Sequence, residues 1–407
     1  MKPNQIFNLS MLLALVTGGI LGSTSLTFVH ESANVIATLF LNMLKLISLP
    51  MIFLALVSTL TRMKNLKEAG FLLKKILKYT LITTLIAAAI GMLVFLIIKP
   101  IKIVENIGPS FTDTKGSYLS FLTQIIPDSL IQPFVSNNVI GMAFIAVVLS
   151  GAILKLPEEK NRILRDFFGA LFDALLKVTS ALIFIMPLGI LAFTIQFVQS
   201  IRAEAHQLQQ LLFYGLCVVS ANLIQGLIIL PLMLKLKGHS PLRTAKGMMP
   251  ALTMAFFSKS SNATLPLSID CAKNRLGISE KTANFSFPLC SVINMNGCAA
   301  FILITFFFVC SSQGITFTIW QMIPWIFLST IAAIGNAGVP MGCFFLTTAF
   351  LIGMGVPLEI MGMILPLYAI FDMVETALNV WSDSCITAVV EQEITQTTPA
   401  PALVESN

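Results

Sequence analysis

The chain has 407 residues, of which 56% are hydrophobic and 11% are charged, and its formal net charge is +6. Soluble domains carry about 25% charged residues, so this composition indicates a polytopic membrane protein with room for about eight to ten spans. The basic residues lie in short loops between apolar blocks, which membrane topology explains better than nucleic-acid binding.

The apolar blocks predict an all-α fold. They fall near 8–28, 35–60, 76–98, 117–154, 168–200, 208–235 and 283–311, before a long apolar run that ends near 390. The first block has no clear small-residue cleavage site, so it is interpreted as a transmembrane helix and not as a signal peptide. Residues 391–407 are polar and predict a disordered cytoplasmic tail.

The loops between these blocks differ in their basic residues. Lys and Arg are frequent after the blocks that end near 60, 154 and 235, and sparse after those that end near 98 and 200. The positive-inside rule therefore places the basic-rich loops and the N-terminus in the cytoplasm.

Two later segments do not have the pattern of simple spans. Residues 249–271 carry a polar stretch at 259–266 between flanks that are both basic, and residues 320–356 carry Gly-Asn-Ala-Gly-Val-Pro at 335–340 between flanks without basic residues. Each segment is predicted to enter and leave the membrane on one side. Two such hairpins of opposite orientation form an inverted repeat, an architecture that is common in secondary transporters.

A polar stripe lies near the end of the apolar run. Asp372, Glu375, Asn379 and Asp383 recur at helical spacing, and no Lys or Arg follows Lys281. Ionised carboxylates in a membrane are expensive and usually mark an ion or substrate pathway. The missing positive charge would come from a metal cation, a proton or the amine of a substrate. For Glu375, a protonated and hydrogen-bonded carboxyl or a structural pair with Lys259 stays an alternative.

Three further polar groups interrupt apolar or hairpin segments. Asn294-Met-Asn-Gly297 is either a cation site in an opened helix or a kink held by Asn hydrogen bonds. The hydroxyls and amides at 260–264 are either an anion site or an ordinary polar loop. Thr83 and Thr84 more often bond back to their own helix than bind an ion.

Cysteine and histidine give no catalytic signal. The seven cysteines show no CxxC spacing and are interpreted as small buried hydrophobic side chains, without a disulfide framework or a metal cluster. The three histidines are far apart in sequence, which argues against a His-based catalytic site.

The motifs at 259–266, 294–297, 335–340 and 372–383 occur in the order and with the spacing of the dicarboxylate/amino acid–cation symporter family. That family includes glutamate transporters and neutral amino acid exchangers, and the chain resembles it over nearly its whole length. The resemblance implies an all-α polytopic membrane protein with eight transmembrane helices and two re-entrant helical hairpins. It also implies a homotrimer that is surrounded by the lipid of the plasma (inner) membrane. Both termini would be cytoplasmic.

The resemblance further implies a division into two units. Residues 1–75 (helices one and two) and 101–205 (helices four and five) would form a trimerisation scaffold. Residues 76–100 (helix three) and 206–390 (helices six to eight and both hairpins) would form a transport unit. The unit would move across the membrane as an elevator, with the second hairpin as the outer gate, and 391–407 would remain a tail.

Roles for single residues also come from the resemblance. The substrate amine would bind Asp372, and its α-carboxylate would bind Asn379 and the tip at Ser260 and Ser261. Further implied substrate contacts are Met295, Cys298, Val339, Glu375 and Thr376. Bound and cotransported Na⁺ would use one site of Asp383, Asn379, Asn294 and the Cys290 carbonyl, a second of carbonyls near Met295, Ile334 and Asn336, and a third of Thr83, Thr84 and Asn296. No organic cofactor is implied.

The chain departs from the family pattern at four positions. Glu375 stands where members with acidic substrates have an Arg, so a neutral amino acid is expected and a cationic one is an alternative. Asn296 replaces an Asp, which weakens the third sodium site and leaves fewer sodium ions or a proton as the coupling ion. Cys298 replaces a Thr. Lys259 adds a positive charge that keeps glutamate, aspartate or another dicarboxylate open as a substrate.

Other classes of function are a receptor or scaffold that has lost transport, a passive channel and an intramembrane enzyme. An enzyme is disfavoured because Asp372 and Asp383 would lie about 16 Å apart along one helix, too far for a catalytic pair. The sequence therefore predicts a cation-coupled amino acid transporter and not an enzyme.

Overall fold

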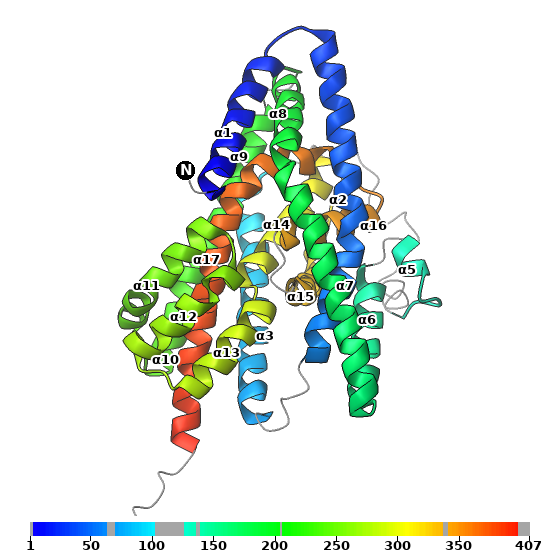
Figure 1. Ribbon diagram of the computed structural model, residues 1–407. Helices are drawn as coiled ribbons and strands as arrows, with labels where there is room; N and C mark the ends of the chain where they lie inside the picture. Colours follow the sequence, from blue (N-terminus) through cyan, green and yellow to red (C-terminus); the bar gives the residue numbers. More distant parts are fainter. Residues whose placement is uncertain are drawn as a thin grey trace, which may run out of the picture.

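Every regular element in the described part of the chain is helical (Figure 1). The computed structural model describes residues 3–62, 70–101, 126–135, 139–203, 206–336 and 341–397. Its elements are α1 (Pro3–Gly22), α2 (Thr27–Arg62), α3 (Gly70–Ile98), α5 (Gln132–Val135), α6 (Val139–Lys155), α7 (Glu158–Phe184), α8 (Met186–Ala203), α9 (His206–Ile224), η2 (Gln225–Ile229), α10 (Leu230–Leu236), α11 (Pro241–Ser258), α12 (Ser261–Leu276), α13 (Glu280–Ile293), α14 (Asn296–Ser312), α15 (Ile319–Gly335), α16 (Gly342–Gly353) and α17 (Glu359–Thr397).

Several of these helices begin at side-chain caps that the sequence supplies. Ser240, Ser260 and Ser279 precede α11, α12 and α13, and each accepts a backbone N–H from the first turn of its helix. Thr318 and Gln321 form a reciprocal capping box at the start of α15. Such caps satisfy N–H groups that have no partner inside the helix, and so they fix where each helix starts.

The helices pack in two sets. In the first, α2 packs against α6, α7 and α8, and α1 packs against α8; α2 and α7 run side by side in Figure 1. In the second, α3 packs against α9, α14 and α15, and α17 packs against α11, α13 and α14. Contacts of α16 with α2 and of α17 with α8 join the sets. The central helix is α14, because every residue from Asn296 to Cys310 is buried.

Four stretches in the described ranges are long and apolar enough to cross a membrane. They are Leu72–Ile98, Leu208–Leu236, Glu280–Ser312 and Glu359–Thr395. Shorter apolar helices include Phe144–Lys155, Met186–Gln199, Ile319–Gly335 and Gly342–Gly353. The helical fold class and its membrane character are confirmed, whereas the total of eight spans stays a prediction.

A helical hairpin lies where the first re-entrant segment is predicted. α11 and α12 pack along each other and are joined by Lys259 and Ser260. Lys259 closes α11 with a left-handed backbone (φ 53°), which lets the chain reverse within two residues. α15 and α16 flank the second predicted tip, whose residues 337–340 lie outside the described ranges.

The helix α17 extends beyond the predicted start of the tail. Residues 391–397 are helical, so the expectation of disorder from Glu391 onward is wrong for this part, and 398–407 lie outside the described residues. Glu393 accepts from Lys75 (2.6 Å), Lys237 (2.7 Å) and the Tyr79 hydroxyl. The hydrogen bond to Glu393 raises the pKa of Lys237. These partners lie far away in sequence, which is why composition alone missed them.

One of the two contacts that join the sets, that of α17 with α8, depends on a glycine of α17. A Cβ on Gly362 would lie 2.3 Å from a ring carbon of Phe193 in α8, a side chain that is itself buried. Gly362→Ala therefore overpacks this contact and should cost about 1–3 kcal/mol. We expect a lower midpoint of thermal unfolding in detergent.

The matched control is Gly151→Ala in α6, where a new Cβ meets nothing within 4 Å. It should leave the midpoint unchanged or raise it, because Ala is a better helix former than Gly. Equal midpoints for both variants would contradict the packing assigned to Gly362.

Candidate functional site

The polar stripe lies on one continuous helix, α17, as the sequence predicts. Glu375, Asn379 and Asp383 are 1%, 4% and 2% exposed, and Asp372 is half-buried. The stripe therefore faces the protein interior, where an ionised carboxylate is costly without a partner.

Opposite the stripe, the predicted helix opening lies between α13 and α14. Asn294 and Met295 have non-helical backbones (φ −100°, ψ 75° and φ −109°, ψ 65°), and both are buried. The N–H of Asn294 donates to the Cys290 carbonyl at 2.8 Å, which closes α13. The Met295 carbonyl accepts the N–H of Ala299 at 3.1 Å, which opens α14.

Two asparagines at this opening bind α17 directly, and one of them, Asn294, binds the stripe. The Asn294 amide donates to the Asp383 carboxylate (2.8 Å) and to Ser382 Oγ (2.9 Å). The Asn296 amide donates to Asn294 Oδ1 (2.8 Å) and to Ser382 Oγ (2.9 Å). The opening is thus both a kink held by Asn hydrogen bonds and a place where buried oxygen atoms converge.

Residues of α3 and η2 complete this cluster. Thr83 Oγ1 accepts from Asn296 (3.3 Å), and Gln225 donates to Asn296 Oδ1 (2.7 Å) and to the Thr83 carbonyl (3.1 Å). Gln225 begins a short π-helix, a feature that often accompanies functional sites. Our sequence reasoning missed Gln225, although an isolated Gln in the apolar block 208–235 was a usable signal.

The donor set of the cluster fits a sodium ion. Asp383 supplies a negative charge, and Asn294 Oδ1 and Thr83 Oγ1 are hard oxygen donors beside it. The Thr84 hydroxyl is buried and has no hydrogen-bond partner among the described residues. Such oxygens suit an alkali cation better than a soft metal. Asn379 points elsewhere: its Oδ1 accepts the N–H of Gly297 (2.9 Å), and its amide contacts the sulfurs of Met295 and Cys298.

A small cavity lies one turn along α17 from this cluster. Its volume is about 30 Å³, room for about two water molecules. Its lining comes from Lys259, Ser260, Ser261, Met295, Cys298, Asn336, Gly342, Cys343, Tyr368, Asp372, Glu375, Thr376 and Asn379. The residues expected to bind substrate are thus brought together, except Val339, which lies outside the described residues. Asn336 is also in the lining, whereas Ile334 is not.

Glu375 is the most unusual group in this cavity. Neither of its carboxylate oxygens has a hydrogen-bond partner among the described residues, although the side chain is buried. The described residues therefore contain no hydrogen bond between Glu375 and Lys259, the structural pair that the sequence left open. Both residues line the cavity.

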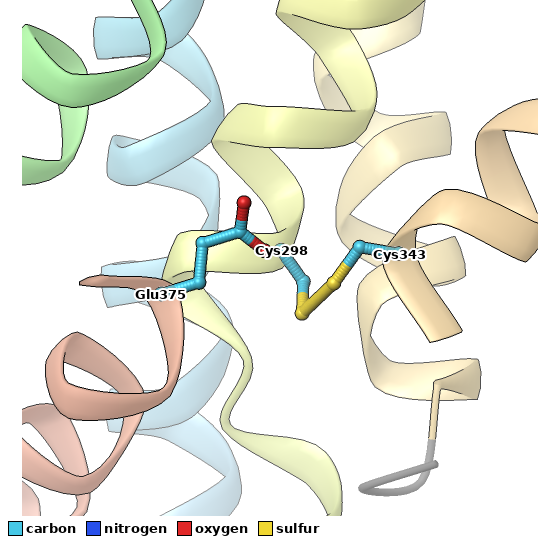
Figure 2. A group of neighbouring side chains, drawn as sticks. All are labelled: Cys298, Cys343 and Glu375. Atoms are coloured by element: carbon cyan, nitrogen blue, oxygen red, sulfur yellow. A yellow bond between two sulfur atoms is a disulfide. The ribbon is translucent and has the colours of Figure 1, made fainter. Parts of the chain in front are cut away.

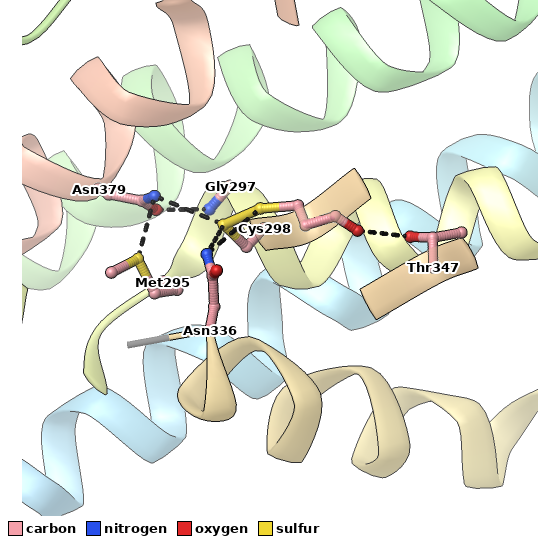
Figure 3. Close-up of a disulfide and its surroundings, with 7 residues drawn as sticks. Met295, Gly297, Cys298, Asn336, Thr347 and Asn379 are labelled. Atoms are coloured by element: carbon pink, nitrogen blue, oxygen red, sulfur yellow. Dashed lines mark hydrogen bonds between the residues drawn. A yellow bond between two sulfur atoms is a disulfide. The ribbon is translucent and has the colours of Figure 1, made fainter. Parts of the chain in front are cut away.

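The cavity also holds a disulfide, between Cys298 and Cys343 (Figures 2 and 3). The expectation that all cysteines are plain hydrophobic side chains is wrong for this pair, because the fold brings together residues 45 apart in sequence. The remaining cysteines are free and buried, as expected. Sulfur and carboxylate atoms of Cys298, Cys343 and Glu375 lie within 4.8 Å of one another. Metal binding needs thiolates, so the disulfide form of this group is not a metal site.

Polar groups buried at a broken helix, next to the tip of a helical hairpin, define the class of secondary transporters. The chain belongs to the Sodium:dicarboxylate symporter family, whose family model matches residues 7–393. It is similar to human Excitatory amino acid transporter 3 (26% identity; 94% of this chain and 85% of the relative are covered). It is equally similar to mouse Neutral amino acid transporter B(0) (26% identity; 88% and 74%). The protein is therefore an integral membrane transporter and not an enzyme.

The role assigned to Gln225 can be measured as stability. Gln225→Leu removes both donated hydrogen bonds and leaves buried oxygens of Asn296 and Thr83 without this donor, which should cost about 1–3 kcal/mol. We expect a lower midpoint of thermal unfolding, while Gln209→Leu, at an exposed position of α9, should change it little. Equal midpoints would show that Gln225 does not hold the cluster together.

Proposed function

We propose that the protein is a sodium-coupled secondary transporter of neutral amino acids. The observation that carries this proposal is the lining of the cavity: Asp372 and Glu375 face the same small space as Lys259 and the hydroxyls of the α11–α12 tip. A zwitterion presents an amine and a carboxylate, and the cavity offers a partner for each.

The amine of the substrate binds Asp372. Its carboxylate binds at Ser260 and Ser261, where α12 begins, because the first N–H groups and the dipole of a helix favour an anion. Lys259 adds a positive charge at the same end. Asn379 and Thr376, one turn apart on α17, complete the wall against which the substrate lies.

The charges of the cavity decide between substrates. When Lys259, Asp372 and Glu375 are all ionised, the cavity carries one net negative charge. An acidic amino acid would add a second negative charge, whereas a neutral amino acid with one sodium ion brings the sum to zero. In a site shielded from water such a difference is large, so Glu375 acts against acidic substrates.

A second candidate is a cationic amino acid. The oxygens of Glu375, which have no hydrogen-bond partner in the described part of the chain, favour it, because a substrate ammonium or guanidinium group would satisfy both of them. An acidic or dicarboxylate substrate would instead need Lys259 to outweigh Glu375. The named relatives include an excitatory and a neutral amino acid transporter at the same identity, so similarity does not rank these substrates.

In this proposal, the coupling ion binds at the buried cluster. Sodium would be held by Asp383, Asn294 and the Cys290 carbonyl, with a second site near Met295 and Asn336. The third site is reduced, because Asn296 presents N–H groups to Asn294, Ser382 and Thr83 where a carboxylate would offer acceptors. Fewer coupled sodium ions, or a proton in place of one, follow from this substitution.

Transport follows the elevator scheme in our proposal. Residues 1–75 and 101–205 form a scaffold in a homotrimer in the plasma (inner) membrane, with cytoplasmic termini, and residues 76–100 and 206–390 move as the transport unit. The packing of α1, α2, α6, α7 and α8 against one another supports this division. The cavity is too small for an amino acid, so α15 and α16 must move to admit one. Ions that stabilise the closed and loaded form couple their own movement to that of the substrate.

The role of Glu375 is tested by exchanging its charge. In liposomes with an inward sodium gradient, the native protein should take up serine, alanine or glutamine in preference to aspartate. Glu375→Arg should shift uptake toward aspartate and glutamate by about tenfold or more, because a guanidinium binds a carboxylate in a bidentate manner. Glu375→Gln, which removes the charge only, is the matched control. Robust aspartate uptake by the native protein would overturn the proposal and point to Lys259.

The sodium site is tested by the concentration of sodium that gives half-maximal uptake. Asp383→Asn keeps the size of the side chain and removes its charge, so this concentration should rise by about tenfold or more. Ser384→Ala is the control, since the hydroxyl of Ser384 bonds back to the Val380 carbonyl of its own helix. An unchanged sodium dependence in Asp383→Asn would refute the assigned site.

A further inference from the structure

The disulfide joins two elements that enclose the cavity. Cys298 lies in the first turn of α14 and Cys343 in the first turn of α16, and their Cα atoms are 5.3 Å apart. Both line the cavity, and Figure 3 shows the sulfurs beside Asn336 and Asn379. The remaining cysteines of the chain do not line it. This pair is thus set apart from every other cysteine by its place.

The bond restricts what the cavity can admit. A cavity with room for about two water molecules cannot hold an amino acid, so α16 has to move away from α14 before an amino acid enters. A disulfide keeps its two Cα atoms within about 7 Å. The bond therefore ties the start of α16 to the start of α14.

We propose that Cys298 and Cys343 are a reversible oxidation site that locks the cavity shut, so that transport requires the reduced pair. The lock rests on the proposed transport function, whereas the oxidation chemistry does not. The oxidant is a peroxide. One thiol is oxidised to a sulfenic acid as the O–O bond breaks and one water leaves. The second thiol then displaces the hydroxyl, the S–S bond forms and a second water leaves. The two sulfurs give up two electrons in total, and the peroxide accepts both.

The surroundings of the pair fit this reaction. Hydrogen peroxide is about the size of two waters, so it fits the cavity without the opening that an amino acid needs. Asn336 donates to both sulfurs (3.2 and 3.6 Å), which favours negative charge on the attacking sulfur. A carboxylate oxygen of Glu375 lies within 4.8 Å of both sulfurs (Figure 2). Neither oxygen of Glu375 has a hydrogen-bond partner in the described ranges, so the carboxylate can take up the thiol proton. A dithiol reverses the reaction by thiol–disulfide exchange.

The test uses the full-length protein in liposomes, prepared under a dithiol, freed of it and then divided. One half is treated with hydrogen peroxide, and a portion of that half is reduced again. Mass spectrometry measures the Cys298–Cys343 cross-linked peptide, and uptake is measured on the same samples. Each variant is compared only with its own untreated half. We expect the cross-link to form and uptake to fall below about a tenth, because a covalent closed state leaves few competent molecules. The dithiol should restore uptake.

Three variants make the outcome specific. Cys298→Ser and Cys343→Ser should each form no cross-link and keep their own uptake after peroxide. Cys310→Ser, in the same helix α14 and away from the cavity, should lose uptake as the native protein does. The proposal is overturned if no cross-link forms, if it forms and uptake is unchanged, or if Cys343→Ser is inhibited as strongly as the native protein.

A second readout separates the lock from the transport function. Hydrogen–deuterium exchange of the α16 amides should be slower in the oxidised protein than in the reduced protein, and Cys343→Ser should lose this difference. If the reduced protein transports no amino acid, the proposed function fails. The exchange rates alone then decide whether oxidation restrains α16. Equal exchange in both redox forms would then overturn it.

Discussion

The hydrogen bond from Asn294 to Asp383 joins the opened helix to the polar stripe, and the site is arranged around it. A carboxylate buried in α17 is costly without a partner, and this amide, at the break between α13 and α14, is such a partner. Asn296, Thr83 and Gln225 extend the same network to α3 and η2. The ends of α13 and α14 are therefore fixed against α17, and that contact sets where the cavity lies.

Close approach of α14 and α17 has a second consequence, for the charge of the cavity. A Cβ on Gly297 would lie 2.9 Å from Cα of Glu375, so only glycine allows this spacing. The same approach brings Glu375 next to Cys298, and Cys298 next to Cys343 of α16. The proposed selectivity and the proposed oxidation site therefore both lie where α14 packs against α17 and α16.

The sequence predicted the parts of the site that depend on local pattern. Helical spacing gave the stripe of α17, and Asn294-Met-Asn-Gly297 gave the opening between α13 and α14. The missed features depend on contacts between distant segments: Gln225 on Asn296, Cys298 on Cys343, and Glu393 on Lys75 and Lys237. No period in the sequence records such pairs. The direction of Asn379 toward Gly297 was missed for the same reason, because spacing gives a face of a helix and not its partner.

The central claim is that a buried carboxylate of α17 is neutralised by a bound sodium ion. The most direct measurement is the midpoint of thermal unfolding of the purified protein, without substrate, in sodium chloride and in choline chloride at equal ionic strength. An ion that binds only the folded state raises its stability by RT ln(1 + [Na⁺]/Kd). We expect a midpoint that rises with sodium concentration in the native protein and stays constant in Asp383→Asn. Identical midpoints in the two salts would contradict the account.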